Sequence, residues 1–251
     1  MNTLFIGQNK VHLRSIDSTN NYTTELMRQS VIHEGTIVIA DEQTNGKGQR
    51  GNEWESESGK NLTLSVYLTP TFLKATEQFY LNKCISLSVA EFIRNVGCKN
   101  VEVKWPNDVL VNGKKIAGIL IENSVRGNFI QSAIVGIGIN INQIQFSFNG
   151  SEYCSSLALE TQFEHNLEAG LGVLCEIIEY RYLKFKTNSK CFDQEYLEQL
   201  YQYEQVATYS IKGKGEVFAQ IKSVNNLGQL ILVDEYGNEF SCNFKEVEFL
   251  R

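Results

Sequence analysis

Several common signatures are missing from this sequence of 251 residues. Its six cysteines form no C-x-x-C pair, and its three histidines have no ligand spacing among themselves or with cysteine. We therefore expect neither a structural zinc site nor a disulfide framework, and we interpret the chain as a cytoplasmic protein with reduced thiols. No apolar run approaches the roughly 18 residues that a membrane span requires. The start, Met1 to Gln8, lacks the apolar core of a secretory signal, so no membrane partner is expected.

An excess of positive charge is also missing. The chain has 23 lysines and arginines against 29 aspartates and glutamates, a formal net charge of −6. A dedicated nucleic-acid binder usually carries a basic face, so DNA is not expected as a partner, although a local cationic pocket is compatible with this charge. The apolar fraction of 42% and the charged fraction of 21% are those of an ordinary globular protein with a substantial core.

Two familiar phosphate-binding motifs are absent as well: G-x-x-x-x-G-K-[ST], and G-x-G-x-x-G at the start of a helix. The sequence has instead a glycine-rich segment, Asp41 to Trp54, which follows a short apolar run at 36–40 that predicts a buried strand. Glycines let a backbone fold closely around a ligand, and the cations of Lys47 and Arg50 suggest that this ligand is an anion such as phosphate. A mobile, solvated surface loop is the alternative interpretation.

Apolar periodicity predicts the first elements. Residues 62–68 alternate apolar and polar side chains, which is the pattern of a half-buried strand. Residues 76–96 and 167–185 repeat apolar side chains at spacings of three and four, so both are expected to be core helices. Asp17 to Asn20 offers several N-cap residues in a row and predicts the start of another helix. Residues 143–165 are polar and are expected to be irregular.

A series of strands on short loops follows residue 100. We expect these strands at residues 101–105, 109–111, 114–122 and 129–140. Pro106 to Asp108 interrupt the first strand, the second resumes it, and Asn112-Gly113 is a strong hairpin signal. Strands joined in this way make an antiparallel meander and not a parallel nucleotide-binding sheet. In that setting Gly136 and Gly138 favour close backbone packing over a dinucleotide site.

Near the C-terminus the sequence pattern changes to short elements separated by turns. A short helix is expected around residues 193–203, and four short strands follow at residues 206–211, 216–224, 229–234 and 239–244. Short strands separated by regular turns predict a small β-barrel. We place the boundary near Tyr203, which gives a larger domain at 1–203 and a small one at 204–251. The fold class expected from these patterns is α+β.

Polar clusters interrupt otherwise apolar elements at residues 18–20, 43–54, 104–115 and at Asn140. Lys115 opens a returning strand, across the hairpin from Asn107 and Asp108. A lysine at this point either meets an anion or reaches solvent at the end of the hairpin, and local sequence alone leaves both interpretations open. None of the histidines lies in these clusters, so no Ser-His-Asp set can be assembled.

Together these clusters resemble the biotin–protein ligases, over nearly the whole chain from about Arg14. Each piece is weak alone, but all of them stand in the order and spacing of that family. The pieces that carry the resemblance are Asp17-Ser-Thr-Asn20, Gln43 to Trp54, Lys104-Trp-Pro-Asn-Asp108, Lys114 to Glu122, Gly136-Ile-Gly-Ile-Asn140 and Ser155-Ser-Leu157. The resemblance implies a catalytic domain with a mixed or antiparallel sheet like that of class II aminoacyl-tRNA synthetases, followed by an SH3-like barrel.

The resemblance also implies which residues form the site. Lys115 would meet the biotin carboxylate, and Lys115 and Arg50 would be the catalytic residues. ATP would lie against Arg50, Trp54, Asn107, Asp108 and Asn140, with Mg²⁺ as cofactor and Asp108 as its ligand. Many relatives have arginine where this chain has Lys47 or Gln49, so the phosphate contact rests more on Arg50. The residues implied for biotin are Ser18, Thr19, Asn20, Gln43, Gly46, Lys47, Gly48, Gln49, Lys115 and Gly118.

The implied activity is the formation of biotinyl-5′-adenylate from biotin and ATP, followed by transfer of biotin to a lysine of a biotin carboxyl carrier protein. A lipoate– or octanoate–protein ligase of related fold is one alternative. A biotin-responsive repressor is another, disfavoured because the chain starts too close to Ser18 for a DNA-binding module to precede it. Both a monomer and a homodimer are compatible with the sequence.

Overall fold

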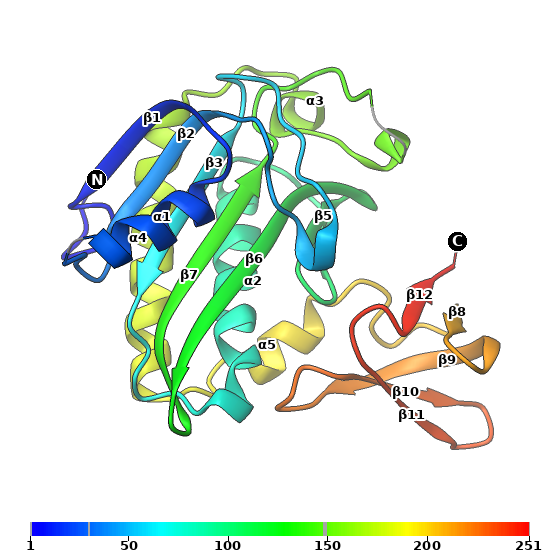
Figure 1. The fold of residues 1–251 in the computed structure, drawn as a ribbon. Coiled ribbons are helices and arrows are strands. Elements are labelled where there is room, and N and C mark those ends of the chain that lie inside the picture. Colours follow the sequence, from blue (N-terminus) through cyan, green and yellow to red (C-terminus); the bar gives the residue numbers. More distant parts are fainter. Residues whose placement is uncertain (1, 30, 148–149, 251) are drawn as a thin grey trace.

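A seven-stranded mixed sheet forms the centre of the larger part of the chain (Figure 1). The computed structural model describes residues 2–29, 31–147 and 150–250, with the side chain of Arg50 left out. The strands lie in the order β1-β2-β3-β7-β6-β5-β4; β1 and β2 are parallel and every other neighbouring pair is antiparallel. Their bounds are β1 Lys10–Ile16, β2 Ile37–Gln43, β3 Leu62–Leu68, β4 Val101–Lys104, β5 Asp108–Val111, β6 Lys114–Arg126 and β7 Phe129–Ile139.

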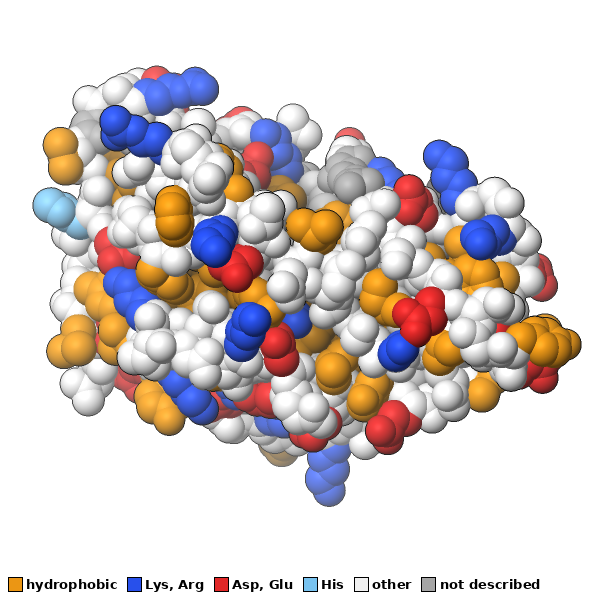
Figure 2. Space-filling view, turned by 90° about the horizontal axis from the view of Figure 1, so that it is seen from below, with side chains coloured by type: hydrophobic (Ala, Val, Ile, Leu, Met, Phe, Trp, Pro, Cys, Tyr) orange, Lys and Arg blue, Asp and Glu red, His pale blue; other side chains and the backbone are white. Residues whose placement is uncertain are grey.

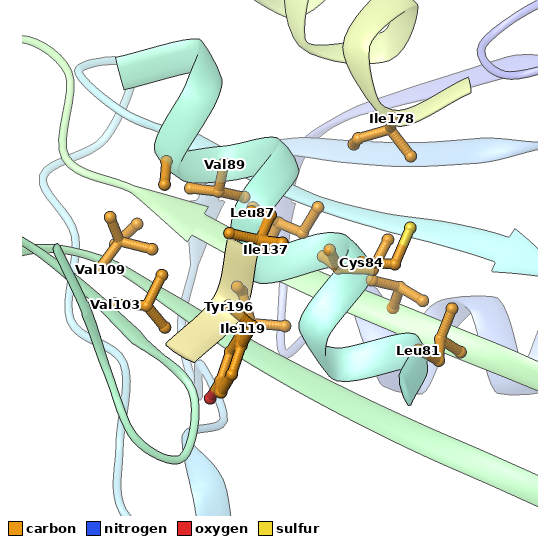
Figure 3. Packing of buried hydrophobic residues seen from close by; sticks show 14 of the residues in the cluster. Leu81, Cys84, Leu87, Val89, Val103, Val109, Ile119, Ile137, Ile178 and Tyr196 are labelled. Atoms are coloured by element: carbon orange, nitrogen blue, oxygen red, sulfur yellow. The ribbon is translucent and has the colours of Figure 1, made fainter. Parts of the chain in front are cut away.

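Two long helices cover one face of this sheet. They are α2, Phe79–Asn95, and α4, Leu167–Thr187, which confirm the helices predicted at 76–96 and 167–185. Figure 3 shows side chains along α2, among them Leu81 and Leu87, which belong to the same buried cluster as Ile119 and Ile137 of the sheet. All four of these side chains are no more than 2% exposed. Burial of such side chains supplies the main driving force for folding.

The opposite face of the sheet carries α1, Thr19–Gln29 (Figure 1). The helix begins in the predicted cap sequence, where the amide of Asn21 donates to the Asp17 carboxylate. That hydrogen bond is the largest cause of a lowered pKa at Asp17. The first two residues of α1 lie over the middle of the sheet, where Thr19 and Asn20 contact Ser65 of β3 and Asn20 also contacts Gly136 of β7.

A β-bulge in β6 decides which of its side chains face α1. Val109 pairs with Ala117 but Leu110 pairs with Lys115, so β6 has one extra residue, Ile116, at this point. Side chains on a regular strand alternate between faces, and a bulge shifts that alternation by one residue. Lys115 therefore shares a face with Gly118, while Ile116 and Ala117 are both fully buried on the core side.

The chain reverses between β4 and β5, which corrects one prediction. Residues 109–111 do not resume the strand at 101–105; Lys104 pairs with Asp108 and Val101 with Val111, as in a hairpin. Proline has no N–H to donate to a sheet and is therefore excluded from the interior of a central strand. The chain turns back through Trp105-Pro106-Asn107, where the Trp105–Pro106 peptide is cis.

A five-stranded antiparallel sheet, here called the C-terminal sheet, follows the short helix α5, Asp193–Glu198. The four strands predicted in this region are confirmed, and the predicted set lacked a fifth, β12, which pairs with β8. A strand of only three residues has too little sequence for a period to be detected. The bounds are β8 Ala207–Ile211, β9 Gly215–Val224, β10 Leu230–Asp234, β11 Glu239–Cys242 and β12 Val247–Phe249.

The C-terminal sheet is held against the larger part of the chain by polar and aromatic contacts. The indole N–H of Trp105 donates to the carbonyl of Gly228 at 2.9 Å, and the hydroxyl of Tyr80 donates to Asn226 at 2.6 Å. The ring of Phe244 lies 5.2 Å from that of Trp105. The segment that carries Asn107 and Asp108 is thus also the segment on which the C-terminal sheet rests.

Residues 143–165 were expected to be irregular, and those that the structure describes, 143–147 and 150–165, are largely so. They contain two single helical turns, at Ser151–Tyr153 and at α3, Leu157–Thr161, each too short for a helical period. Two further single turns occur at Gln49–Gly51 and Ala75–Glu77. On the face seen in Figure 2, acidic and basic side chains are interspersed. None of the helices in the described residues is long and apolar enough to cross a membrane.

Candidate functional site

A cavity of about 710 Å³ opens on the α1 face of the sheet, between the sheet, the glycine-rich segment and the C-terminal sheet. It brings together residues that are far apart in the sequence, including the first turn of α1, the end of β2 and the hairpin between β5 and β6. Of the residues predicted for the site, those that line it are Ser18, Thr19, Asn20, Gln43, Lys47, Gly48, Gln49, Trp54, Asn107, Asp108, Lys115 and Gly118.

An ion pair between Lys115 and Asp108 lies in this cavity. The Lys115 ammonium is 2.7 Å from Oδ1 of Asp108, and the two side chains are 33% and 25% exposed. The bulge at Ile116 creates the pair, because it turns Lys115 onto the face from which Asp108 projects. The sequence left two interpretations of Lys115 open, and the ion pair supports the one in which its ammonium meets an anion. A partly desolvated ammonium at this position can hold a second carboxylate or a phosphate.

Neutral polar groups form a connected network at the α1 end of the cavity. Oε1 of Gln43 accepts hydrogen bonds from the backbone N–H of Thr19 at 2.8 Å and from its hydroxyl at 3.1 Å. The amide of Asn20 donates to Glu122 at 2.7 Å, and the hydroxyl of Ser65 lies 2.6 Å from Oδ1 of Asn20. These groups are suited to a small ligand with its own N–H and C=O groups.

The glycine-rich segment folds into a small hairpin over the cavity. Trp54 N donates to Gly46 O at 2.8 Å, and Gly48 N donates to Asn52 O at 2.7 Å. A Cβ at residue 46 would lie 2.3 Å from the Trp54 carbonyl oxygen, so only glycine allows this close approach. The ammonium of Lys47 donates to Asn21 and is thereby directed towards the start of α1.

The indole of Trp54 lies on two glycines of the sheet. A Cβ at Gly138 would meet the ring at 2.4 Å, and one at Gly118 would meet it at 3.1 Å. The prediction of close packing at Gly136 and Gly138 is confirmed. The Trp54 ring lies against Gly138, and the amide of Asn20 lies against Gly136. The ammonium of Lys115 is 5.6 Å from the Trp54 ring centroid. The indole N–H is buried and has no partner among the described residues.

Some predicted residues have another position or another use. Gly46 shapes the hairpin and does not line the cavity. Asn140 is buried behind the cavity wall; its amide donates to Ser155 O, and its Oδ1 has no partner within the described part of the chain. Asn107 lines the cavity, but its amide donates to the backbone of Ile119 at 2.7 Å. The side chain of Arg50, predicted to be catalytic, lies outside the described structure.

The cavity also has residues that sequence reasoning did not assign. Cys154 lines it close to Lys115, but burial raises the pKa of its thiol despite that cation, which disfavours the reactive thiolate. One wall comes from the C-terminal sheet and its turns, for which no sequence signal is available because the contact is purely tertiary. Residues of that wall are Phe244, Lys245, Val247, Glu248, Phe249 and Leu250.

The family model described as "Biotin/lipoate A/B protein ligase family" matches residues 12–140. Among characterised proteins, the bifunctional ligase/repressor BirA of Bacillus subtilis is 36% identical over 144 residues, which are 57% of this chain and 43% of that protein. The biotin–[acetyl-CoA-carboxylase] ligase of Paracoccus denitrificans is 39% identical over 131 residues, 51% of this chain and 53% of that protein. The matched region thus spans about half the length of these relatives.

Solved structures extend the likeness to almost the whole chain. The biotin protein ligase of Aquifex aeolicus in complex with biotin and ATP has a TM-score of 0.80 and 26% sequence identity, over 97% of this chain and 99% of that one. The biotin protein ligase of Leishmania major in complex with biotin has a TM-score of 0.65 over 95% of this chain and 99% of that one, and at 21% identity it shows the fold alone.

Proposed function

This chain belongs to the biotin/lipoate A/B protein ligase family, and we propose that it is an ATP-dependent biotin–protein ligase. It activates biotin as biotinyl-5′-adenylate, releases pyrophosphate, and transfers biotin to a lysine of a biotin carboxyl carrier protein. The observation that carries the proposal is one cavity that holds the Lys115 ammonium, the polar α1 end and the glycine-rich hairpin together. The likeness to an A. aeolicus ligase in complex with biotin and ATP supports it.

The chemistry is governed by charge. The carboxylate of biotin must attack the α-phosphate of ATP, and two anions repel each other. Lys115 in the cavity and Lys47 on the hairpin can offset that repulsion, and one such donor placed in advance typically lowers a barrier by about 3–4 kcal/mol. The polar ring of biotin, with two N–H groups and one C=O, fits the network around Thr19 and Asn20. We propose that Gly118, Gly48 and Gln49 line the space between these two ends, and that Arg50 adds a further cation.

ATP would lie beside Asn107, Asp108 and Trp54, with Asn140 behind them. A mixed anhydride such as an acyl adenylate is hydrolysed when water reaches it, so the site has to exclude water. The hairpin at 46–54 is the element of this chain placed to cover the cavity, with the Trp54 indole facing inward. Its buried, unpartnered N–H would gain an acceptor when a ligand carrying oxygen atoms binds.

Mg²⁺ would accompany ATP. No group of three or more His, Cys, Asp or Glu side chains in the described residues could hold a metal ion. Mg²⁺ usually keeps several waters and is bound through one or two carboxylates together with substrate phosphates. Asp108 fits this role as a single carboxylate at the cavity, and the bound ion would help to neutralise the phosphates.

We further propose that the mixed sheet is of the class II aminoacyl-tRNA synthetase type and that the C-terminal sheet is an SH3-like barrel, with the domain boundary near residue 203. The helices α2 and α4 on one face of the sheet, and the five short antiparallel strands after residue 206, support this assignment. The carrier protein acts as partner, and no role on DNA is proposed.

The decisive experiment is exchange of labelled pyrophosphate into ATP by the purified chain, with biotin, lipoate or octanoate as the carboxylic acid. Exchange that depends on biotin, followed by labelling of a purified carrier domain, is the expected result. Exchange supported by lipoate or octanoate and not by biotin would assign the chain to the other branch of the family. Absence of exchange with all three acids would overturn the proposed activity.

A further inference from the structure

The side-chain amide of Asn20 lies across the middle of the sheet, in a position that only glycine leaves open. Ser65 of β3, Gly136 of β7 and Leu120 of β6 form one row of paired residues, and Asn20 descends onto that row from α1. A Cβ at Gly136 would lie 2.5 Å from Oδ1 of Asn20. Asn20 is only 3% exposed and lines the cavity, so the direction of its amide decides what the cavity offers to a ligand.

Glu122 decides that direction. An ionised carboxylate can only accept hydrogen bonds, so the Asn20 atom that faces it must be the NH₂ group. The distance from Nδ2 of Asn20 to Oε2 of Glu122 is 2.7 Å, and the carbonyl of Leu120, also an acceptor, lies 3.5 Å from the same nitrogen. The Oδ1 atom is consequently turned towards the hydroxyl of Ser65, which lies 2.6 Å from it and 2.8 Å from the hydroxyl of Thr19. A hydroxyl has one hydrogen to donate, and the Asn20 oxygen is the nearer of these two acceptors. A reversed amide would direct a carbonyl oxygen at a carboxylate.

The orientation has a chemical consequence for the cavity. A carbonyl oxygen has two lone pairs, and among the described residues Ser65 is the donor to Oδ1 of Asn20. The second lone pair can accept from a ligand N–H. On the other side, Oε1 of Gln43 is already engaged by Thr19, so its amide nitrogen faces the glycine-rich hairpin. The contacts with Glu122 and Thr19 therefore define the orientation of both amides, that of Asn20 and that of Gln43.

We infer that Glu122 is a positioning residue for substrate recognition: through the amide of Asn20 it presents a hydrogen-bond acceptor to an N–H of the cyclic urea of the substrate. The inference rests on the proposed function, because biotin is the ligand that supplies this urea. Glu122 belongs to the segment from Lys114 to Glu122 that resembles the ligase family, and it lies seven residues beyond Lys115. It is not among the residues that line the cavity, and it acts on the cavity through Asn20, which does line it.

Kinetics of two variants test this role. In Glu122→Ala the Asn20 amide is free to reverse, and the KM for biotin should rise about tenfold, the effect of losing one oriented hydrogen bond. The KM for ATP and kcat should remain within about twofold of wild type. Glu122→Gln offers both a donor and an acceptor, so both orientations of Asn20 become possible and the KM should rise about two- to threefold. Ser124→Ala, the next outward-facing position on β6, is the matched control.

A double-mutant cycle with Asn20→Ala separates action through Asn20 from a general effect on the strand. When Asn20 is already truncated, removal of Glu122 should change the KM for biotin by less than about twofold. Additive effects of the two substitutions on the KM for biotin would overturn the inference, and so would equal KM values for Glu122→Ala and Ser124→Ala. Biotin-dependent exchange by the wild type would still uphold the proposed activity in either case. If Glu122→Ala does not fold, a wild-type KM in Glu122→Gln overturns it. Loss of exchange by the wild type itself would remove the proposed function, and the inference with it.

Discussion

Lys115 and Asp108 form an ion pair of 2.7 Å at the wall of the cavity, on adjacent strands whose register is shifted by a β-bulge. The lysine is thus held in place before any substrate binds. A substrate carboxylate that enters must share or displace Asp108, and it finds the cation already oriented and partly desolvated. Preorganisation of this kind lowers a barrier because no reorganisation is needed at the moment of reaction.

Lys115→Ala should abolish formation of the adenylate, because two anions would then have to approach each other without the ammonium and Asp108 would be left unpaired. We expect a fall of at least about 100-fold in kcat for biotin-dependent exchange of pyrophosphate into ATP. Lys114→Ala, which removes an exposed neighbour on the same strand, should retain wild-type exchange. Near-normal exchange by the Lys115 variant would refute the assigned role.

The elements of the fold could largely be predicted because their signals are local. The alternation of β3 and the helical spacing of α2 and α4 are properties of ten to twenty consecutive residues. The polar clusters also predicted most of the cavity lining, since a polar side chain in an apolar element needs a reason. The bulge in β6 had no such signal, because residues 116–121 contain no polar side chain whose alternation it could interrupt.

Other parts of the site could not be predicted, for a physical reason. The contact between Asn20 and Glu122 joins residues 102 positions apart, and the C-terminal wall of the cavity depends on how one sheet rests against the other. Such contacts follow from the packing of whole elements, which no short window of sequence contains. Ser65 belongs to the same class. Residues 62–68 were predicted to be a half-buried strand, but all seven are buried because α1 covers the second face, and the Ser65 hydroxyl is within hydrogen-bond distance of Thr19 and Asn20.

Gly138→Ala should displace the indole of Trp54, because the new methyl group would lie 2.4 Å from the ring. We expect the tryptophan emission to shift to longer wavelength as this indole enters water, while Trp105, 3% exposed, is unchanged. The KM for biotin should rise as the lining of the cavity changes. Gly170→Ala is the control: its Cβ would lie 3.5 Å from Phe92, and replacing glycine inside α4 should stabilise the fold by about 0.5–1 kcal/mol. Identical emission in Gly138→Ala and wild type would contradict this placement of Trp54.

The stability of the fold should fall in alkaline solution. Burial raises the pKa of the Cys175 thiol from its ordinary value of 9.0 to about 12. Between these values the folded state keeps a proton that the unfolded chain has lost, so stability is fully present below pH 9 and is lost as the pH rises towards 12. In that range Cys175→Ala should reduce the slope of the free energy of unfolding against pH by up to about 1.4 kcal/mol per pH unit. The measurement is denaturant unfolding from pH 8 to 11, and parallel curves for the variant and wild type would rule out the contribution.

Arg181 joins three helices through a buried ionic network, and its removal should be the most destabilising of these changes. Its Nε lies 2.6 Å from Glu91 of α2, its terminal nitrogens lie 2.7 Å and 3.0 Å from Glu195 of α5, and the residue is 8% exposed. Truncation leaves two carboxylates without their cation, and these carboxylates are 33% and 35% exposed. The cost should therefore lie between the roughly 1 kcal/mol of a surface pair and the about 3–5 kcal/mol of a fully buried pair. Lys222→Ala breaks the exposed pair with Glu239 and should cost at most about 1 kcal/mol. Denaturant unfolding of both variants measures the difference, and equal costs would mean that the Arg181 network contributes no more than a surface pair.

Because α5 leads directly into the C-terminal sheet, loss of Arg181 should also loosen the cavity wall that this sheet provides, which would raise the KM for ATP in the folded fraction of the variant.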